Sequence, residues 1–289
     1  MAPVWLATCA AAVWGLWWIP IRYLESLGLH GAWAGMTMNG GAFLVALAWM
    51  VFSRSPFQMS ARALIGAVLV GVAVSTYSTA LTYTDVVRAV LLFYLAPVWS
   101  KMIEWAFLRL PWHWWTTLAL IAALLGAWLV LGAETSFDAL NRGDVLSLVS
   151  GLAWAAGAAL VFSGGAAGAM SLTTVATFFS VLVAVPIALA SGAPGMGDGL
   201  GLAVPLGLGA GAIYVLPIMA LTLWSARRLS PTVLTFLLTA EILSGVISGA
   251  WLLDEPFGWM QMAGTLLIVL AALSEVLSGL RNAQVVKDH

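Results

Sequence analysis

The chain has 289 residues, of which 62% are hydrophobic and 8% are charged, and its formal net charge is −1. A soluble domain carries about 25% charged residues, and the mean hydropathy of this chain is +1.02. This composition excludes a soluble enzyme, a nucleic-acid-binding protein and a disordered protein. We therefore expect membrane lipid as the main surroundings of the chain, and no nucleic-acid partner.

Apolar stretches of about 20 residues, the length that crosses a bilayer as a helix, recur between charged residues, Pro and Gly. The first stretch lacks the basic leader of a signal peptide, so we interpret it as a retained span. The sequence predicts an all-α integral membrane protein with ten transmembrane helices, at residues 4–24, 32–52, 61–82, 87–108, 114–132, 143–163, 172–190, 201–225, 231–253 and 258–279.

The orientation of these spans is predicted from the Lys and Arg residues of the short loops, which gather on the cytoplasmic side. With a cytoplasmic N-terminus, three basic residues lie outside, namely Arg22, Arg88 and Arg142. Seven lie on the cytoplasmic side: Arg54, Arg62, Arg109, Arg227, Arg228, Arg281 and Lys287. Both termini are therefore predicted to be cytoplasmic, which agrees with an even number of spans.

The two halves of the chain repeat each other. A shift of 145 residues sets Pro111 on Pro256 and Trp114 on Trp259, and a shift of 140 sets Trp14 on Trp154. We predict two five-helix domains, residues 1–140 and residues 141–289. Because five is an odd number, the second repeat is inserted upside down, an arrangement that places transporter substrate sites between the repeats near the midplane.

Three motifs carry a resemblance to a known family. They are Ala12-Val13-Trp14-Gly15, the stretch from Ala226 to Val233 that leads into Ala240-Glu241-Ile242, and Trp251-Leu252-Leu253-Asp254-Glu255-Pro256 followed by Gln261 and Gly264. The chain resembles the EamA-type branch of the drug/metabolite transporter superfamily. It departs from that pattern at Ile242, where Pro is common, and at Arg109-Leu110-Pro111, which lacks the usual acidic residue.

Within this superfamily, the Trp- and Tyr-rich spans are most similar to bacterial exporters of aromatic amino acids. The resemblance implies a multi-pass protein of a bacterial-type cytoplasmic (inner) membrane that works by alternating access. The expected partners are a small-molecule substrate and lipid, and the expected state is a monomer. The sequence shows no nucleotide-binding motif and no hydrolase motif, so we expect neither an enzyme nor ATP use.

Charged residues inside spans are costly and usually face the interior of the bundle. Glu241 lies mid-span and is either a neutral acid in a helix contact or a group that binds a substrate ammonium or a proton. Lys101, with Glu104 at i+3, forms either a structural pair or a site for a carboxylate. Glu275 is interpreted as structural. Cys9 is the single cysteine and the histidines are scattered, so no metal and no cofactor are expected.

Aromatic residues and two prolines complete the predicted site. Val90, Tyr94, Pro97 and Lys101 share one helical face, and we expect Pro97 and Pro217 to kink their spans. Some tryptophans, Trp33 among them, fit interfacial anchoring, whereas others lie deep in spans and suit a pocket for planar rings. The predicted substrate-binding residues are Trp14, Trp17, Tyr77, Tyr94, Lys101, Trp154, Tyr214 and Glu241.

The sequence therefore predicts a secondary transporter that exports aromatic and other neutral hydrophobic amino acids. The alternative is an efflux transporter for aromatic cationic drugs or metabolites, which Glu241 would hold together with cation–π contacts. Sugar-phosphate exchange ranks lower, because phosphate needs several cationic donors and the span interiors offer only Lys101.

Overall fold

The computed structural model describes residues 2–54, 56–108, 112, 114–130, 140–228, 231–253 and 257–285. Within these ranges the regular structure is helical, apart from one bridge between Met59 and Ala167. The predicted breaks at Arg109-Leu110-Pro111 and at Asp254-Glu255-Pro256 lie outside the described residues, as do the side chains of Pro97, Glu104, Ile242 and Glu275.

The helices follow the predicted spans closely. They are α1 (Ala2–Trp14), α2 (Trp18–Ser26), α3 (Ala32–Phe52), α4 (Ala61–Tyr83), α5 (Val86–Phe93), α6 (Ala96–Leu108), α7 (Trp114–Val130), α8 (Arg142–Ser163), α9 (Ala169–Ala190), the 3₁₀ turn η2 (Gly197–Leu200), α10 (Ala203–Ala210), the π-helical segment η3 (Gly211–Val215), α11 (Leu216–Ala226), α12 (Pro231–Leu252) and α13 (Trp259–Val285). Among the described residues, seven stretches are long and apolar enough to cross a membrane, and two shorter apolar helices lie at Trp114–Gly126 and Trp259–Ala271. The chain is thus a multi-pass membrane protein.

Three predicted spans are interrupted rather than continuous. The first breaks at residues 15–17, where the amides of Leu16 and Trp17 bond to carbonyls three residues back, at 3.0 and 2.9 Å, as in a tightened 3₁₀ turn. The fourth breaks at Tyr94–Leu95, immediately before the turn of α6 that holds Pro97. The eighth contains the π-helical segment Gly211–Val215, and Pro217 follows it in the first turn of α11.

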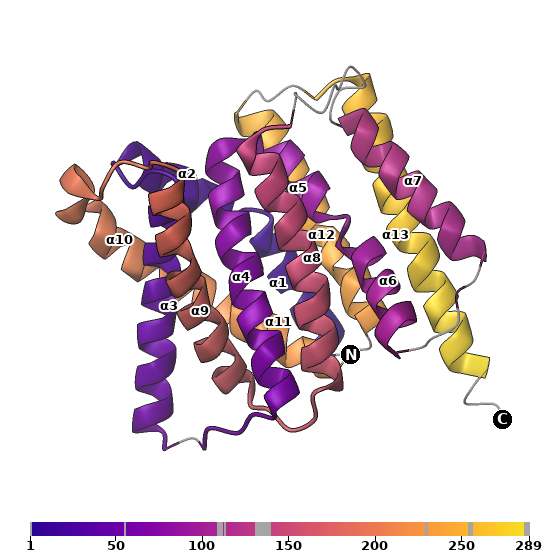
Figure 1. The fold of residues 1–289 in the computed structure, drawn as a ribbon, viewed down its shortest axis with the longest axis horizontal. Helices are drawn as coiled ribbons and strands as arrows, with labels where there is room; N and C mark the ends of the chain where they lie inside the picture. Colours follow the sequence, from indigo (N-terminus) through magenta and orange to yellow (C-terminus); the bar gives the residue numbers. More distant parts are fainter. Residues whose placement is uncertain are drawn as a thin grey trace.

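The helices pack into one bundle with a helix pair at its edge (Figure 1). α4 packs against α8 and α9, and α1 packs against α12 and α11, while α5 and α6 pack against α8. α7 and α13 lie along each other at one edge, and they contact the rest of the bundle mainly through α12, α5 and α6.

The crossing of α1 and α12 is close because of Gly15. A Cβ atom at Gly15 would lie 2.1 Å from Ser244 Oγ and 2.4 Å from the carbonyl oxygen of Glu241. Only a residue without a side chain fits this contact, which brings the first interruption of the chain directly against the middle of α12. The same crossing positions Trp14, Trp17 and Glu241 around one space.

Candidate functional site

A cavity of about 380 Å³, its opening included, lies about half-way along the helices of the bundle. Its walls come from α1 and the turn after it, α4, α5, α8 and α12. The lining residues are Trp14, Trp17, Ala73, Val74, Tyr77, Phe93, Ser150, Trp154, Leu238 and Glu241. Five predicted site residues, Trp14, Trp17, Tyr77, Trp154 and Glu241, therefore line the same cavity, which we call the central cavity.

The aromatic walls of the central cavity form a continuous series of ring contacts. Trp14 and Trp17 meet edge to face with centroids 4.8 Å apart, and Trp17 lies 6.1 Å from Tyr77. Tyr77 lies 4.9 Å from Phe93, which in turn lies 6.4 Å from Trp154. Offset and edge-to-face arrangements of this kind are the favourable ones, so the walls are held in place by their mutual contacts.

Two indole groups of α1 and the following turn differ in their hydrogen bonding. The Trp14 Nε1–H donates to Thr222 Oγ1 of α11 at 3.1 Å, which fixes that ring. Trp17 is 1% exposed, and its Nε1–H has no acceptor among the described residues. A buried donor without a partner costs about 1–3 kcal/mol, so a ligand that brings an acceptor to Trp17 recovers that free energy.

Glu241 is the charged residue of the central cavity lining, and it is 5% exposed. The Tyr94 hydroxyl lies 3.1 Å from Glu241 Oε2 and also within hydrogen-bonding distance of the Leu238 carbonyl. A phenol has one proton to donate. When that proton goes to the Leu238 carbonyl, the contact with Glu241 is a hydrogen bond only if the carboxyl group is protonated and donates to the phenol oxygen. The hydrogen bonding between Tyr94 and Glu241 therefore depends on whether Glu241 is protonated.

The structure separates Lys101 from the central cavity. Tyr94, Val98 and Lys101 lie on the walls of a second space between α6, α7 and α13, whereas Val90 packs against Gly245 of α12. The face predicted from the sequence as one cavity wall is thus divided between two environments. The division follows from the break at Tyr94–Leu95, which separates α5 from α6.

Tyr214 and the two prolines lie beside the site rather than in its lining. Tyr214 is in the π-helical segment, and its hydroxyl donates to the Val13 carbonyl of α1, next to the break at residues 15–17. Pro97 and Pro217 each occupy the second position of a helix that follows an interruption. At Pro97 a proline is tolerated because the first-turn amides have no partner within the helix. Pro217 instead directly continues a π-helical segment, in which the Leu216 amide bonds to the Gly211 carbonyl.

A buried ion pair lies near one end of the bundle, and its residues are not among the site residues predicted from the sequence. Asp144 of α8 is 0% exposed, and its carboxylate accepts hydrogen bonds from Arg88 Nη2 at 2.5 Å and Arg88 Nε at 3.2 Å. It also accepts from the Thr84 hydroxyl at 2.9 Å and takes part in a capping box with Asn141. The Asn141–Asp144 spacing is a recognisable helix-start signal, but nothing in the sequence joins it to Arg88.

The opposite end of the bundle is joined through backbone. The bridge between Met59 and Ala167 is flanked by hydrogen bonds from the Ser60 amide to the Ala166 carbonyl, at 3.2 Å, and from the Gly168 amide to the Gln58 carbonyl, at 3.1 Å. Arg227 donates to the Ala167 carbonyl. The loops that precede α4 and α9 are thereby tied together.

The fold is that of a membrane-embedded helical protein with a cavity at the middle of its bundle. In agreement with this class, residues 1–132 match the model of the EamA-like transporter family. The match does not reach the level of a subfamily, so the resemblance to exporters of aromatic amino acids stays a prediction.

One solved structure, described as "Crystal structure of protein", is similar with a TM-score of 0.61. It covers 97% of this chain and 98% of that chain at 17% sequence identity, and at such identity the likeness concerns the fold alone. No curated protein matches the sequence.

Proposed function

We propose that the chain is a secondary transporter that exports aromatic and other neutral hydrophobic amino acids across the cytoplasmic membrane. One observation carries the proposal: the central cavity joins aromatic walls to a single carboxylate, Glu241, and to the unpartnered indole N–H of Trp17. Rings of the substrate stack on the walls, its ammonium group binds Glu241, and its carboxylate accepts the hydrogen bond of Trp17.

The transport cycle that we propose is alternating access between two inverted halves, residues 1–140 and 141–289, with both termini cytoplasmic. The packing partners support this division. Within the halves, α11 packs against α9 in the second half as α4 packs against α3 in the first. Between the halves, α12 packs against α1 as α5 and α6 pack against α8. Such related contacts are expected when two repeats surround one central site.

A second candidate function is the efflux of aromatic cations, and one observation favours it. Lys101, the intramembrane cation expected to hold a carboxylate, lies outside the central cavity. A cavity with a carboxylate and aromatic faces also suits an organic cation, because both attract positive charge.

The test measures uptake of labelled phenylalanine into liposomes that contain the purified protein, with tryptophan, aspartate and tetraphenylphosphonium as competitors. The amino-acid proposal expects saturable uptake that tryptophan blocks and aspartate does not. Trp17→Ala lowers this uptake at least tenfold, whereas Trp251→Ala, at a lipid-facing position that is 81% exposed, leaves it unchanged.

Glu241→Gln separates the two candidate functions. Transport of tetraphenylphosphonium depends on the charge of Glu241 and collapses in the variant, while phenylalanine, which is also held by stacking, loses a smaller part of its uptake. Absence of phenylalanine uptake together with Glu241-dependent transport of the cation would replace the first proposal with the second.

A further inference from the structure

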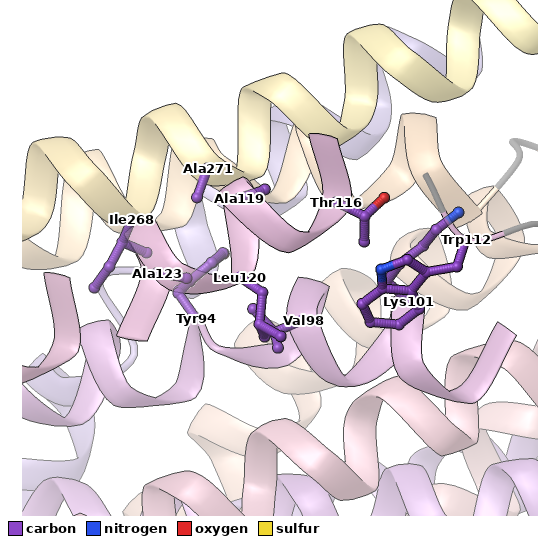
Figure 2. Close-up of a pocket in the computed structure, with 10 residues that line it drawn as sticks. All are labelled: Tyr94, Val98, Lys101, Trp112, Thr116, Ala119, Leu120, Ala123, Ile268 and Ala271. Atoms are coloured by element: carbon purple, nitrogen blue, oxygen red, sulfur yellow. The ribbon is translucent and has the colours of Figure 1, made fainter. Parts of the chain in front are cut away.

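The space between α6, α7 and α13 is separate from the central cavity and has a volume of about 360 Å³, its opening included (Figure 2). We call it the side pocket. Tyr94 lies between the two spaces. It is a lining residue of the side pocket, and its hydroxyl lies 3.1 Å from Oε2 of Glu241, which lines the central cavity.

The walls of the side pocket are apolar because the helices present small and aliphatic side chains to it. Three alanines, Ala119, Ala123 and Ala271, leave the room, and Val98, Leu120 and Ile268 provide larger apolar surfaces. Such walls suit the hydrocarbon or aromatic body of a ligand.

Polar groups gather at one end of the side pocket. Figure 2 shows Lys101, Trp112 and Thr116 together there, at the other side of the view from Ile268 and Ala123. A lysine ammonium carries three donors, so Lys101 can serve a ligand carboxylate in addition to contacts within the protein.

The hydroxyl of Thr116 is a second polar group that requires a partner. Thr116 is 3% exposed, and its Oγ1 has no hydrogen-bond partner among the described residues. Other threonines of the bundle, such as Thr173 and Thr222, donate to the carbonyl four residues back. Thr116 is the third residue of α7, so no helical carbonyl lies one turn behind it. Its hydroxyl is therefore available to an acceptor within the side pocket.

We propose that the side pocket is a second ligand site, which binds the carboxylate of an apolar organic acid. Lys101 and Thr116 donate to the carboxylate, and the aliphatic walls hold the apolar body. As a transport element the inference rests on the proposed function: an amino acid waits in the side pocket, held by its carboxylate, before it passes Tyr94 and places its ammonium group at Glu241.

Binding is tested with labelled 3-phenylpropanoate, an aromatic acid without an amine, in equilibrium dialysis against the purified protein in nanodiscs. Empty nanodiscs correct for partition into lipid. We expect saturable binding whose Kd rises about tenfold in Lys101→Met, the loss of one charge-assisted hydrogen bond, and severalfold in Thr116→Val. Lys101→Arg retains binding.

Matched variants and a neutral analogue decide the outcome. Thr265→Val, on α13, removes a hydroxyl that already donates to the Gln261 carbonyl, and it leaves the Kd unchanged. The proposal is overturned by absence of saturable binding, by equal competition from 3-phenylpropan-1-ol, or by an unchanged Kd in both Lys101→Met and Thr116→Val. Should Lys101→Met fail to fold, the nearly isosteric Thr116→Val carries the test alone.

The two proposals fail in different ways. Binding of 3-phenylpropanoate that depends on Lys101, without any phenylalanine uptake, sinks the transport proposal and leaves the side pocket as a carboxylate site. If phenylalanine is taken up but the Kd of 3-phenylpropanoate is the same in the Lys101 and Thr116 variants, only the inference about the side pocket is overturned.

Discussion

At the scale of single residues, the ion pair of Arg88 and Asp144 joins α5 to α8. Two guanidinium nitrogens reach the carboxylate, and Asp144 is fully buried. Breaking a buried pair by removing one partner leaves an uncompensated charge, which costs about 3–5 kcal/mol. Asp144→Asn, which keeps the shape and an oxygen for the Asn141 amide, is therefore expected to lower the free energy of unfolding by this amount.

The expected loss is measured by denaturation of the purified protein in mixed micelles. The double variant Asp144→Asn/Arg88→Met is the control, because it removes both charges. Its loss of unfolding free energy should be smaller than the sum of the losses in Asp144→Asn and Arg88→Met measured separately. Additive losses would show that the two side chains do not interact in the membrane protein.

The cavity residues that the sequence predicts are those whose free-energy cost in lipid, or whose rarity there, is evident from residue type and position in the span. Glu241 and the mid-span residues Trp14, Trp17, Tyr77 and Trp154 are expensive or unusual in lipid, and all five line the central cavity. Phe93, Ser150 and Leu238 carry no such signal, because whether they face the cavity depends on how each helix is rotated.

Trp33 and Lys101 show which contacts the local sequence signal does not contain. The sequence predicts an interfacial anchor at Trp33, but its side chain is 9% exposed and donates to the Pro194 carbonyl at 2.9 Å. That acceptor is 161 residues away in sequence, so the sequence pattern around Trp33 does not predict this hydrogen bond. Lys101 shares a predicted face with Tyr94, and only the side pocket, formed together with α7 and α13, separates it from the central cavity.

At the scale of elements, the close crossing of α1 and α12 depends on the absence of a side chain at Gly15. A methyl group there would collide with the Glu241 carbonyl and with Ser244 Oγ, so Gly15→Ala forces the two helices apart. We expect a loss of about 1–3 kcal/mol, the usual cost of overpacking, together with reduced transport, because Trp14, Trp17 and Glu241 meet at this crossing.

Gly209→Ala in α10 is the matched control, since a Cβ atom at Gly209 would meet nothing within 4 Å. Replacing a helical glycine by alanine without a clash favours the helix by about 1 kcal/mol. Unfolding in mixed micelles should therefore move in opposite directions for the two variants. A shift in the same direction would mean that the α1–α12 contact is looser than the structure indicates.

Helix positions were predictable because hydrophobic length is a strong signal, whereas the interruptions were predictable only in part. Pro97 and Pro217 marked two of them, yet the backbone changes before each proline, at Tyr94–Leu95 and at Gly211–Val215. The break at residues 15–17 has no proline and runs through Gly15-Leu16-Trp17. It coincides with the close contact of Gly15 with α12, a tertiary contact that the sequence of one span does not contain.

At the scale of the whole molecule, the two ends of the bundle are joined differently: Arg88 and Asp144 connect α5 to α8 near one end, and the bridge of Met59 and Ala167 connects two loops at the other. Alternating access requires one end to open while the other stays closed. The proposed cycle must then break the backbone bridge, because it ties together the loops that precede α4 and α9.

A disulfide across this bridge should therefore stop transport. Directly opposed residues of an antiparallel bridge have Cα atoms about 4.5–5.5 Å apart, which suits a disulfide. Met59→Cys with Ala167→Cys, in a Cys9→Ser background that removes the only native thiol, is expected to lose phenylalanine uptake after oxidation and to regain it after reduction. Each single-cysteine variant, oxidised in the same way, should keep its uptake. Full uptake with the disulfide formed in nearly all molecules would mean that substrate passes without separation of these loops, and the rocking of two halves would have to be replaced by a local movement around Tyr94 and the central cavity.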